Sequence, residues 1–175
     1  MMEIQIRPQS AEEAFLYVKN CFRKRKFYQE NGYSIDLPEH PAFIEVFNNS
    51  EETFEEKENE LKKIFFEDVY PKLDFSEALE KCQKNLPEIL ERLTRLSLQF
   101  GFKLLDSYVI VLTPYGPGGS YDSRGTIVIK TNSCRSFLER IIHEAVHIGV
   151  ENEVLRKNLN HLEKEKLVES ICQSN

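Results

Sequence analysis

The sequence lacks the features that mark membrane and secreted proteins. No apolar run approaches the roughly 20 residues that a membrane-spanning helix needs. The first ten residues are mixed in polarity and contain no apolar core of a secretory signal. We therefore expect a cytoplasmic protein that has no membrane partner.

Paired cysteines are also missing. The four cysteines, Cys21, Cys82, Cys134 and Cys172, are scattered and form no CxxC motif. This spacing disfavours a cysteine-based zinc site and indicates free thiols in a reducing compartment.

Positive charge is scarce. The formal net charge is −6, and the one basic run, residues 23–26, is short and flanked by aromatic residues. Such a run is typical of the solvated face of an amphipathic helix, so we expect no nucleic-acid partner. A composition of 41% apolar and 30% charged residues suits a soluble globular protein with a substantial core.

The first 80 residues read as mainly helical. Ser10 and Glu13 form a capping box before a helix over residues 10–31, and an acidic helix over residues 50–70 stops at Pro71. Between them, residues 43–47 look extended. We predict that residues 1–80 form a helical N-terminal extension packed on a core of residues 81–175.

The pattern in the second half changes from helical to extended and back. Residues 74–100 predict a helix or a helix pair, with Pro87 in a first turn. Two β-branched strands follow, over residues 108–113 and 126–130, on either side of a glycine-rich loop. The next helix, capped by Ser133 or Ser136, should end near Gly149, and residues 160–172 form the last helix. The fold class is therefore α+β, with a small antiparallel or mixed sheet.

The most informative stretch is HExxH, formed by His143, Glu144 and His147. Two histidines four residues apart lie on one face of a helix, where both rings can reach one metal ion. Glu144 projects beside that face and can accept a proton from a metal-activated water. The helix is otherwise strongly apolar, so buried imidazoles there need polar partners.

A third metal ligand must come from elsewhere. The metzincin pattern does not fit, because Glu153 stands where it requires histidine. In the last helix, Glu165 and Glu169 lie together at the edge of the apolar arc. We favour Glu165 as the ligand and Glu169 as the acceptor for the outer N–H of a zinc-bound histidine. His161 is the alternative ligand, whereas Glu151 lies too far along the HExxH helix to reach the same ion as both histidines.

This combination of HExxH and a downstream ExxxE resembles the gluzincin branch of the zincin-type zinc metallopeptidases. The second motif of that branch is commonly ExxxD, and this chain has Glu169 in place of the aspartate. Over about 100 residues, the order of helix, small sheet, HExxH helix and glutamate helix is similar to the compact minigluzincins.

The resemblance implies a zincin-like fold and one Zn2+ per chain, held by His143, His147 and Glu165. It implies hydrolysis of peptide bonds with a zinc-activated water and Glu144 as general base. It further implies that residues 126–130 form an edge strand that aligns a peptide or protein substrate antiparallel to itself. Three side chains near the glycine-rich loop are candidates for stabilising the oxyanion, namely Tyr115, Tyr121 and Arg124.

An alternative function is a catalytically silent zincin scaffold that serves as a binding or regulatory module. In that case zinc is structural or the site is closed, and residues 1–80 cover the cleft. The ligand set also allows hydrolysis of a non-peptide amide. Homo-oligomerisation, substrate and biological role stay open.

Overall fold

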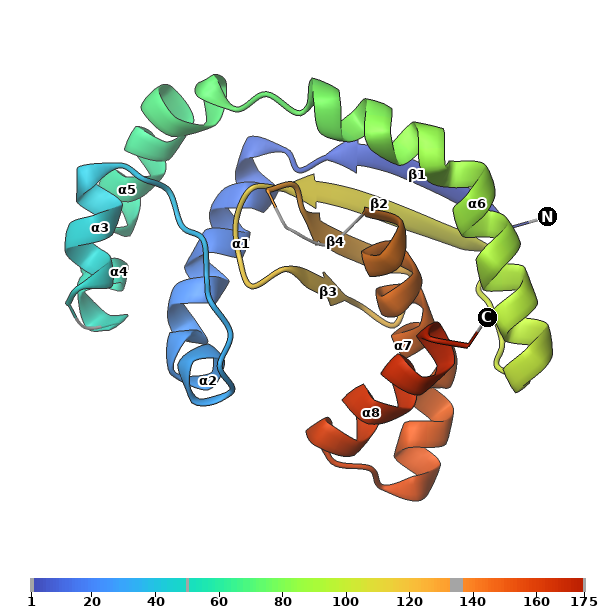
Figure 1. Ribbon diagram of the computed structural model, residues 1–175. Helices are drawn as coiled ribbons and strands as arrows, with labels where there is room; N and C mark the ends of the chain where they lie inside the picture. The colour runs from blue at the N-terminus through green and yellow to red at the C-terminus, as the bar shows by residue number, and fades with distance from the viewer. Residues whose placement is uncertain (1, 50, 133–136, 175) are drawn as a thin grey trace. The chain divides into compact units, whose positions relative to one another are not determined.

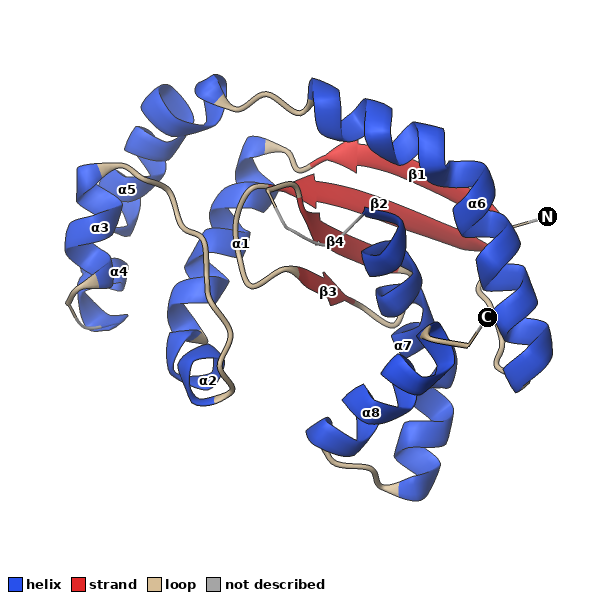
Figure 2. Ribbon diagram, viewed as in Figure 1, coloured by secondary structure: helices blue, strands red, loops and turns tan. Residues whose placement is uncertain are grey.

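The computed structural model describes residues 2–49, 51–132 and 137–174. These residues form two compact units. The sheet unit comprises the described residues within 1–7, 76–112 and 119–175, and the helical unit those within 8–75 and 113–118. The described part of the chain contains eight α-helices and one mixed four-stranded sheet, which confirms the α+β class (Figure 2).

The sheet has the strand order β1-β2-β4-β3. Its strands are β1 (Glu3–Pro8), β2 (Ser107–Thr113), β3 (Gly119–Tyr121) and β4 (Thr126–Lys130). The arrows of β1 and β2 point the same way in Figure 2, whereas β3 runs antiparallel to β4. The register of that pair sets Gly119 opposite Ile129 and Tyr121 opposite Ile127.

The two predicted strands are confirmed as β2 and β4, but the prediction that residues 126–130 form an edge strand is wrong. β4 lies between β2 and β3, and the edge is β3. The cause is the short strand inside the glycine-rich loop. Its first residue is a glycine and it is only three residues long, so it carries no β-branched signal.

The N-terminal residues also differ from expectation. Glu3–Pro8 is strand β1 at the opposite edge of the sheet, and is therefore not part of a helical extension. The backbone N–H of Glu3 donates to the carbonyl of Asp106, just before β2, at 2.9 Å. The helical unit starts only at Pro8 and ends at Phe75, apart from the returning segment Thr113–Gly118.

Three helices accompany the sheet: α6 (Ser76–Phe100), α7 (Phe137–Lys157) and α8 (His161–Cys172). They pack against one another, and α7 also contacts β3 and β4 (Figure 1). Helix α6 is one continuous helix and not a pair. Pro87 therefore lies in its interior and not in a first turn, and because proline has no N–H, one backbone hydrogen bond is missing there.

Helix α7 runs eight residues past Gly149, where the sequence predicts its end. A Cβ at position 149 would lie 2.4 Å from the Phe102 ring. The glycine therefore serves close packing instead of termination. The expected helix caps Ser133 and Ser136, like Cys134, lie outside the described residues.

A tight turn joins α7 to α8. Asn158 has φ of 51°, a left-handed conformation that asparagine tolerates at a helix C-terminus. Asn160 then caps α8, because its side chain accepts from the backbone N–H of Glu163 at 3.0 Å while the Glu163 carboxylate accepts from the N–H of Asn160 at 2.9 Å. The turn and the cap together fix where α8 begins, and hence where Glu165 lies.

The helical unit contains α1 (Ala11–Arg23), α2 (Arg25–Glu30), α3 (Pro41–Phe47), α4 (Glu51–Glu56) and α5 (Glu58–Ile64), followed by short helical turns over Phe65–Val69 and Tyr70–Lys72. The predicted capping box of Ser10 and Glu13 is confirmed. Residues 43–47 are helical and not extended, since Pro41 opens α3 and the His40 ring accepts from the N–H of Ala42. The core of the unit is rich in aromatic rings, among them Phe15, Phe22, Phe43, Phe54, Phe65 and Tyr115.

Within residues 2–49, 51–132 and 137–174, no helix is both long enough and apolar enough to cross a bilayer.

Three of the four cysteines lie in the described residues, and none of these three forms a disulfide. Burial raises the pKa of Cys21 to about 12 and that of Cys82 to about 11, whereas Cys172 is half-buried. Because the thiolate is the reactive form, we expect iodoacetamide at pH 8 to leave Cys21 and Cys82 unmodified in the native protein. Peptide mass spectrometry before and after denaturation measures this. Equal labelling in both states would contradict the burial of these thiols.

Candidate metal centre

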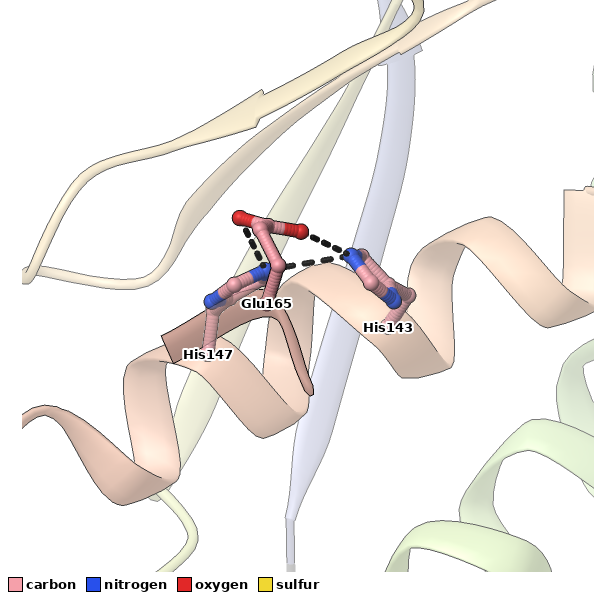
Figure 3. A group of neighbouring side chains, drawn as sticks. All are labelled: His143, His147 and Glu165. Carbon is pink, nitrogen blue, oxygen red and sulfur yellow. Dashed lines mark hydrogen bonds and ion pairs between the residues drawn. The ribbon is translucent and has the colours of Figure 1, made fainter. Parts of the chain in front are cut away.

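Three side chains converge where α7 meets α8 in the sheet unit. His143, His147 and Glu165 each offer one donor atom, and these atoms lie within 4.8 Å of one another (Figure 3). In the part of the chain that the structure describes, this is the one such group of three or more histidine, cysteine or carboxylate side chains.

The distances in this group are short and similar. The Nε2 atoms of His143 and His147 are 3.0 Å apart, and they lie 3.5 Å and 3.4 Å from the two carboxylate oxygens of Glu165. Ligands held about 2.0–2.1 Å from a tetrahedral ion are roughly 3.3 Å apart, so the spacing suits one small ion. A pair of imidazoles and a carboxylate is also a donor set that binds zinc.

The helices explain why these side chains face one another. His143 and His147 are one turn apart on α7, so both rings project from one face. His147 is buried, His143 and Glu165 are partly buried, and Glu165 lies on the fifth residue of α8. Buried imidazoles are costly without partners, and Nδ1 of His147 has none in the described residues. The polar partner that the sequence predicts for this face is Glu165, which contacts the Nε2 atom of His147.

The protonation states follow from burial and mutual contact. Hydrogen bonds from His143 and His147 hold the pKa of Glu165 far below its usual range. Burial lowers the pKa of His147. Burial acts the same way on His143, but contacts with Cys172 and Glu165 outweigh it and raise its pKa. Without metal, the raised pKa of His143 and the lowered pKa of Glu165 favour a proton on the imidazole beside the carboxylate, whereas a metal ion requires the neutral imidazole.

Glu144 lies next to this group, against the edge strand. A Cβ built on Gly119 of β3 would lie 2.3 Å from Oε1 of Glu144 and 3.0 Å from its Cδ. The carboxylate therefore occupies the space that any other residue at position 119 would fill. Burial raises the pKa of Glu144 to about 7, with the nearby charge of His143 opposing the shift. A carboxyl group with this pKa can accept and release a proton near neutral pH.

The remaining candidates have other surroundings. His161 is more exposed, and its Nδ1 is 3.8 Å from the Glu165 carboxylate, outside the three-residue group. Glu169 is exposed. Its carboxylate accepts no hydrogen bond from Nδ1 of His147, because that atom has no partner in the described residues. Glu151 lies on the continued α7 and pairs with Lys164 at 3.2 Å.

The three proposed oxyanion donors are not equivalent. Tyr115 belongs to the helical unit, where its ring is buried against Phe65. Arg124 is exposed and paired with Asp122 in the β3–β4 turn. Tyr121 adjoins a metal ligand, because its ring stacks on His147 with centroids 5.3 Å apart and planes 13° apart.

Sequence reasoning missed two close neighbours of the ligands. Gly119 went unnoticed because β3 was hidden in the glycine-rich loop; once a strand is assigned there, alternation sets Gly119 and Tyr121 on one face. Cys172, whose proximity helps to raise the pKa of His143, was interpreted as part of an apolar helix face. Its position seven residues after Glu165, about two turns along α8, could have indicated it.

Comparisons with protein-family models, curated proteins and solved structures found no match to this chain.

The raised pKa of Glu144 makes a prediction for the metal-free protein. Its ionisation costs more in the folded than in the unfolded state, so Glu144 destabilises the fold increasingly as pH rises from about 4.5 to about 7. In the presence of a chelator, Glu144→Gln should raise the free energy of unfolding by roughly 1–3 kcal/mol at pH 8, and by less than about 1 kcal/mol at pH 5. Urea unfolding at the two pH values measures this. A gain that is the same at both would show that Glu144 ionises normally.

Proposed function

We propose that this chain is a zinc-dependent metallopeptidase with a zincin-like fold of the gluzincin kind. One observation carries the proposal: the donor atoms of His143, His147 and Glu165 converge on one point while the Glu144 carboxylate lies beside them against a sheet edge. Each half of this arrangement is common in proteins, but their combination is what zinc-assisted hydrolysis requires.

The donor set fits Zn2+. It consists of two neutral imidazole nitrogens and a carboxylate, the set of many catalytic sites that leave a fourth position open. The two Nε2 atoms are 3.0 Å apart and each lies within 3.5 Å of one of the two Glu165 oxygens, so all three groups can reach a single ion. When bound, zinc supplies a water of lowered pKa and polarises the carbonyl under attack.

Glu144 is the proposed general base. Its pKa of about 7 lets it take a proton near neutral pH and return that proton to the leaving amine. The positive charge of a bound ion would lower this pKa and favour the ionised, proton-accepting form. The Glu144 carboxylate packs against Gly119, the first residue of β3.

The edge strand β3 is the proposed guide for the substrate. Among the described strands it pairs with β4 alone, so we propose that an extended peptide adds to the sheet at this edge. Gly119 and Tyr121 lie on the face of β3 that contacts Glu144 and His147. A peptide paired with this edge would therefore pass close to Glu144 and His147. This assigns to β3 the role that the sequence suggested for residues 126–130.

The proposal predicts about one zinc per chain. We expect His143→Ala and Glu165→Ala to lose most of the bound zinc, because each removes one of three donors. His161→Ala and Glu169→Ala should keep it and serve as matched controls on α8. Elemental analysis of dialysed proteins measures the metal content. If Glu165→Ala keeps full zinc while His161→Ala loses it, the donor set is wrong, and a wild type that takes up no zinc rules out the proposed function.

The proposal also predicts peptidase activity that depends on Glu144 and its neighbour. On a panel of quenched fluorescent peptides, Glu144→Gln should lower hydrolysis by about 10²–10⁴-fold with zinc retained. Gly119→Ala should lower it by at least about 10-fold, because the new Cβ displaces the flexible end of Glu144. Gly32→Ala is the control: φ there is 72° and no atom lies within 4 Å of the added Cβ, so it strains the backbone in the helical unit, which carries none of the metal ligands, and should leave activity intact. A zinc-loaded wild type that cleaves no peptide would favour the binding module instead.

A further inference from the structure

A second polar group links the three elements that surround the candidate metal centre. Lys164 of α8 donates to the hydroxyl of Tyr121 on β3 and lies 3.2 Å from Glu151 Oε2 on α7. The Tyr121 hydroxyl donates to the same Glu151 oxygen at 3.0 Å. We call these three residues the α7–α8–β3 bridge.

The bridge is next to the metal ligands at each of its ends. Lys164 immediately precedes Glu165, and Glu151 lies one turn after His147 on α7. The Tyr121 ring stacks on the His147 imidazole with an interplanar angle of 13°. The bridge therefore connects the helix that carries the carboxylate donor to the helix that carries both histidines.

The bridge differs from an ordinary surface ion pair, which contributes little. The Lys164 side chain is only 19% exposed and that of Glu151 34%. The pair has a third member, and the Lys164 ammonium also lies 5.1 Å from the centroid of the Tyr121 ring. By contrast, the pair of Glu153 with Lys157, also on α7, lies within one helix and its side chains are 37% and 53% exposed.

Helix α8 supplies only one of the three donors, so its position relative to α7 decides whether Glu165 meets the histidine nitrogens. Metal–ligand distances tolerate deviations of about 0.2 Å, much less than a loosely docked helix would show. Hydrogen-bonded partners around a metal site commonly contribute 10–100-fold to its affinity.

We propose that Glu151, Lys164 and Tyr121 are positioning residues that set zinc affinity by holding α8 in register with α7. This inference rests on the proposed function, since it requires that the site binds zinc. Tyr121 thereby has a role other than oxyanion donor, because its hydroxyl is already committed to Lys164 and Glu151.

The test compares zinc affinity in variants of opposite charge change, measured by competition with a chromophoric chelator. Removing a cation beside the site would tighten zinc binding if electrostatics alone acted, and removing an anion would weaken it. If the bridge positions α8, both Lys164→Met and Glu151→Gln weaken zinc binding by about 10-fold or more. Glu153→Gln, two residues further along α7, should change it by less than about twofold.

Two further variants separate positioning from general stability. Lys164→Arg replaces the ammonium by a guanidinium but keeps a positive charge and N–H donors for Tyr121 and Glu151, and should bind zinc to within about threefold of wild type, whereas loss as large as in Lys164→Met overturns the inference. Tyr121→Phe keeps the stacked ring but removes the hydroxyl, and is the milder variant should Lys164→Met not fold. Its Co2+ form should show a visible ligand-field spectrum that differs from that of wild type; an identical spectrum and affinity would overturn the role of the hydroxyl.

The outcomes distinguish this inference from the proposed function. Tighter zinc binding by Lys164→Met, or unchanged binding by both charge variants, overturns the bridge while the metal site stands. A wild type that binds no zinc overturns both. Weaker binding by both charge variants, with rescue by Lys164→Arg, supports the bridge.

Discussion

The site depends on one constraint: α8 must return across α7 so that a carboxylate on one helix meets two imidazoles on the other. The two imidazole Nε2 atoms are 3.0 Å apart, and each lies within 3.5 Å of a Glu165 oxygen. Partly buried imidazoles and carboxylates without such partners would be costly. The low pKa of Glu165 is a consequence of this meeting, because both histidines hydrogen-bond its carboxylate. The Asn158 turn and the Asn160 cap make the meeting possible, because they fix where α8 starts.

The ligands themselves could be predicted from the sequence because helical periodicity is a strong signal. The spacing of His143 and His147, and the position of Glu165 at the edge of an apolar arc, each follow from about 100° of rotation per residue. The α+β class and the strands β2 and β4 follow from equally clear patterns of β-branched residues.

What surrounds the ligands could not be predicted, since it depends on tertiary packing. Glycine was interpreted as a helix stop at position 149 and as loop at position 119, yet both positions admit the close approach of another side chain. Strand β3 has only three residues and β1 has only two apolar ones, Ile4 and Ile6, so their pairing with β4 and β2 is what identifies them as strands. The contacts of Lys164 with Glu151 on α7 and Tyr121 on β3 likewise exist only in the folded chain.

The short turn between α7 and α8 has a consequence for how the centre assembles. All three donors lie within one helical hairpin, so little chain entropy is lost in bringing them together, and this contact is local in sequence. The contact of Glu144 with Gly119 is of a different kind, because it requires the sheet edge to be complete and docked on α7. The hairpin therefore brings the three donors close together, while the contacts from β3, Tyr121 with Lys164 and Gly119 with Glu144, exist only in the finished fold.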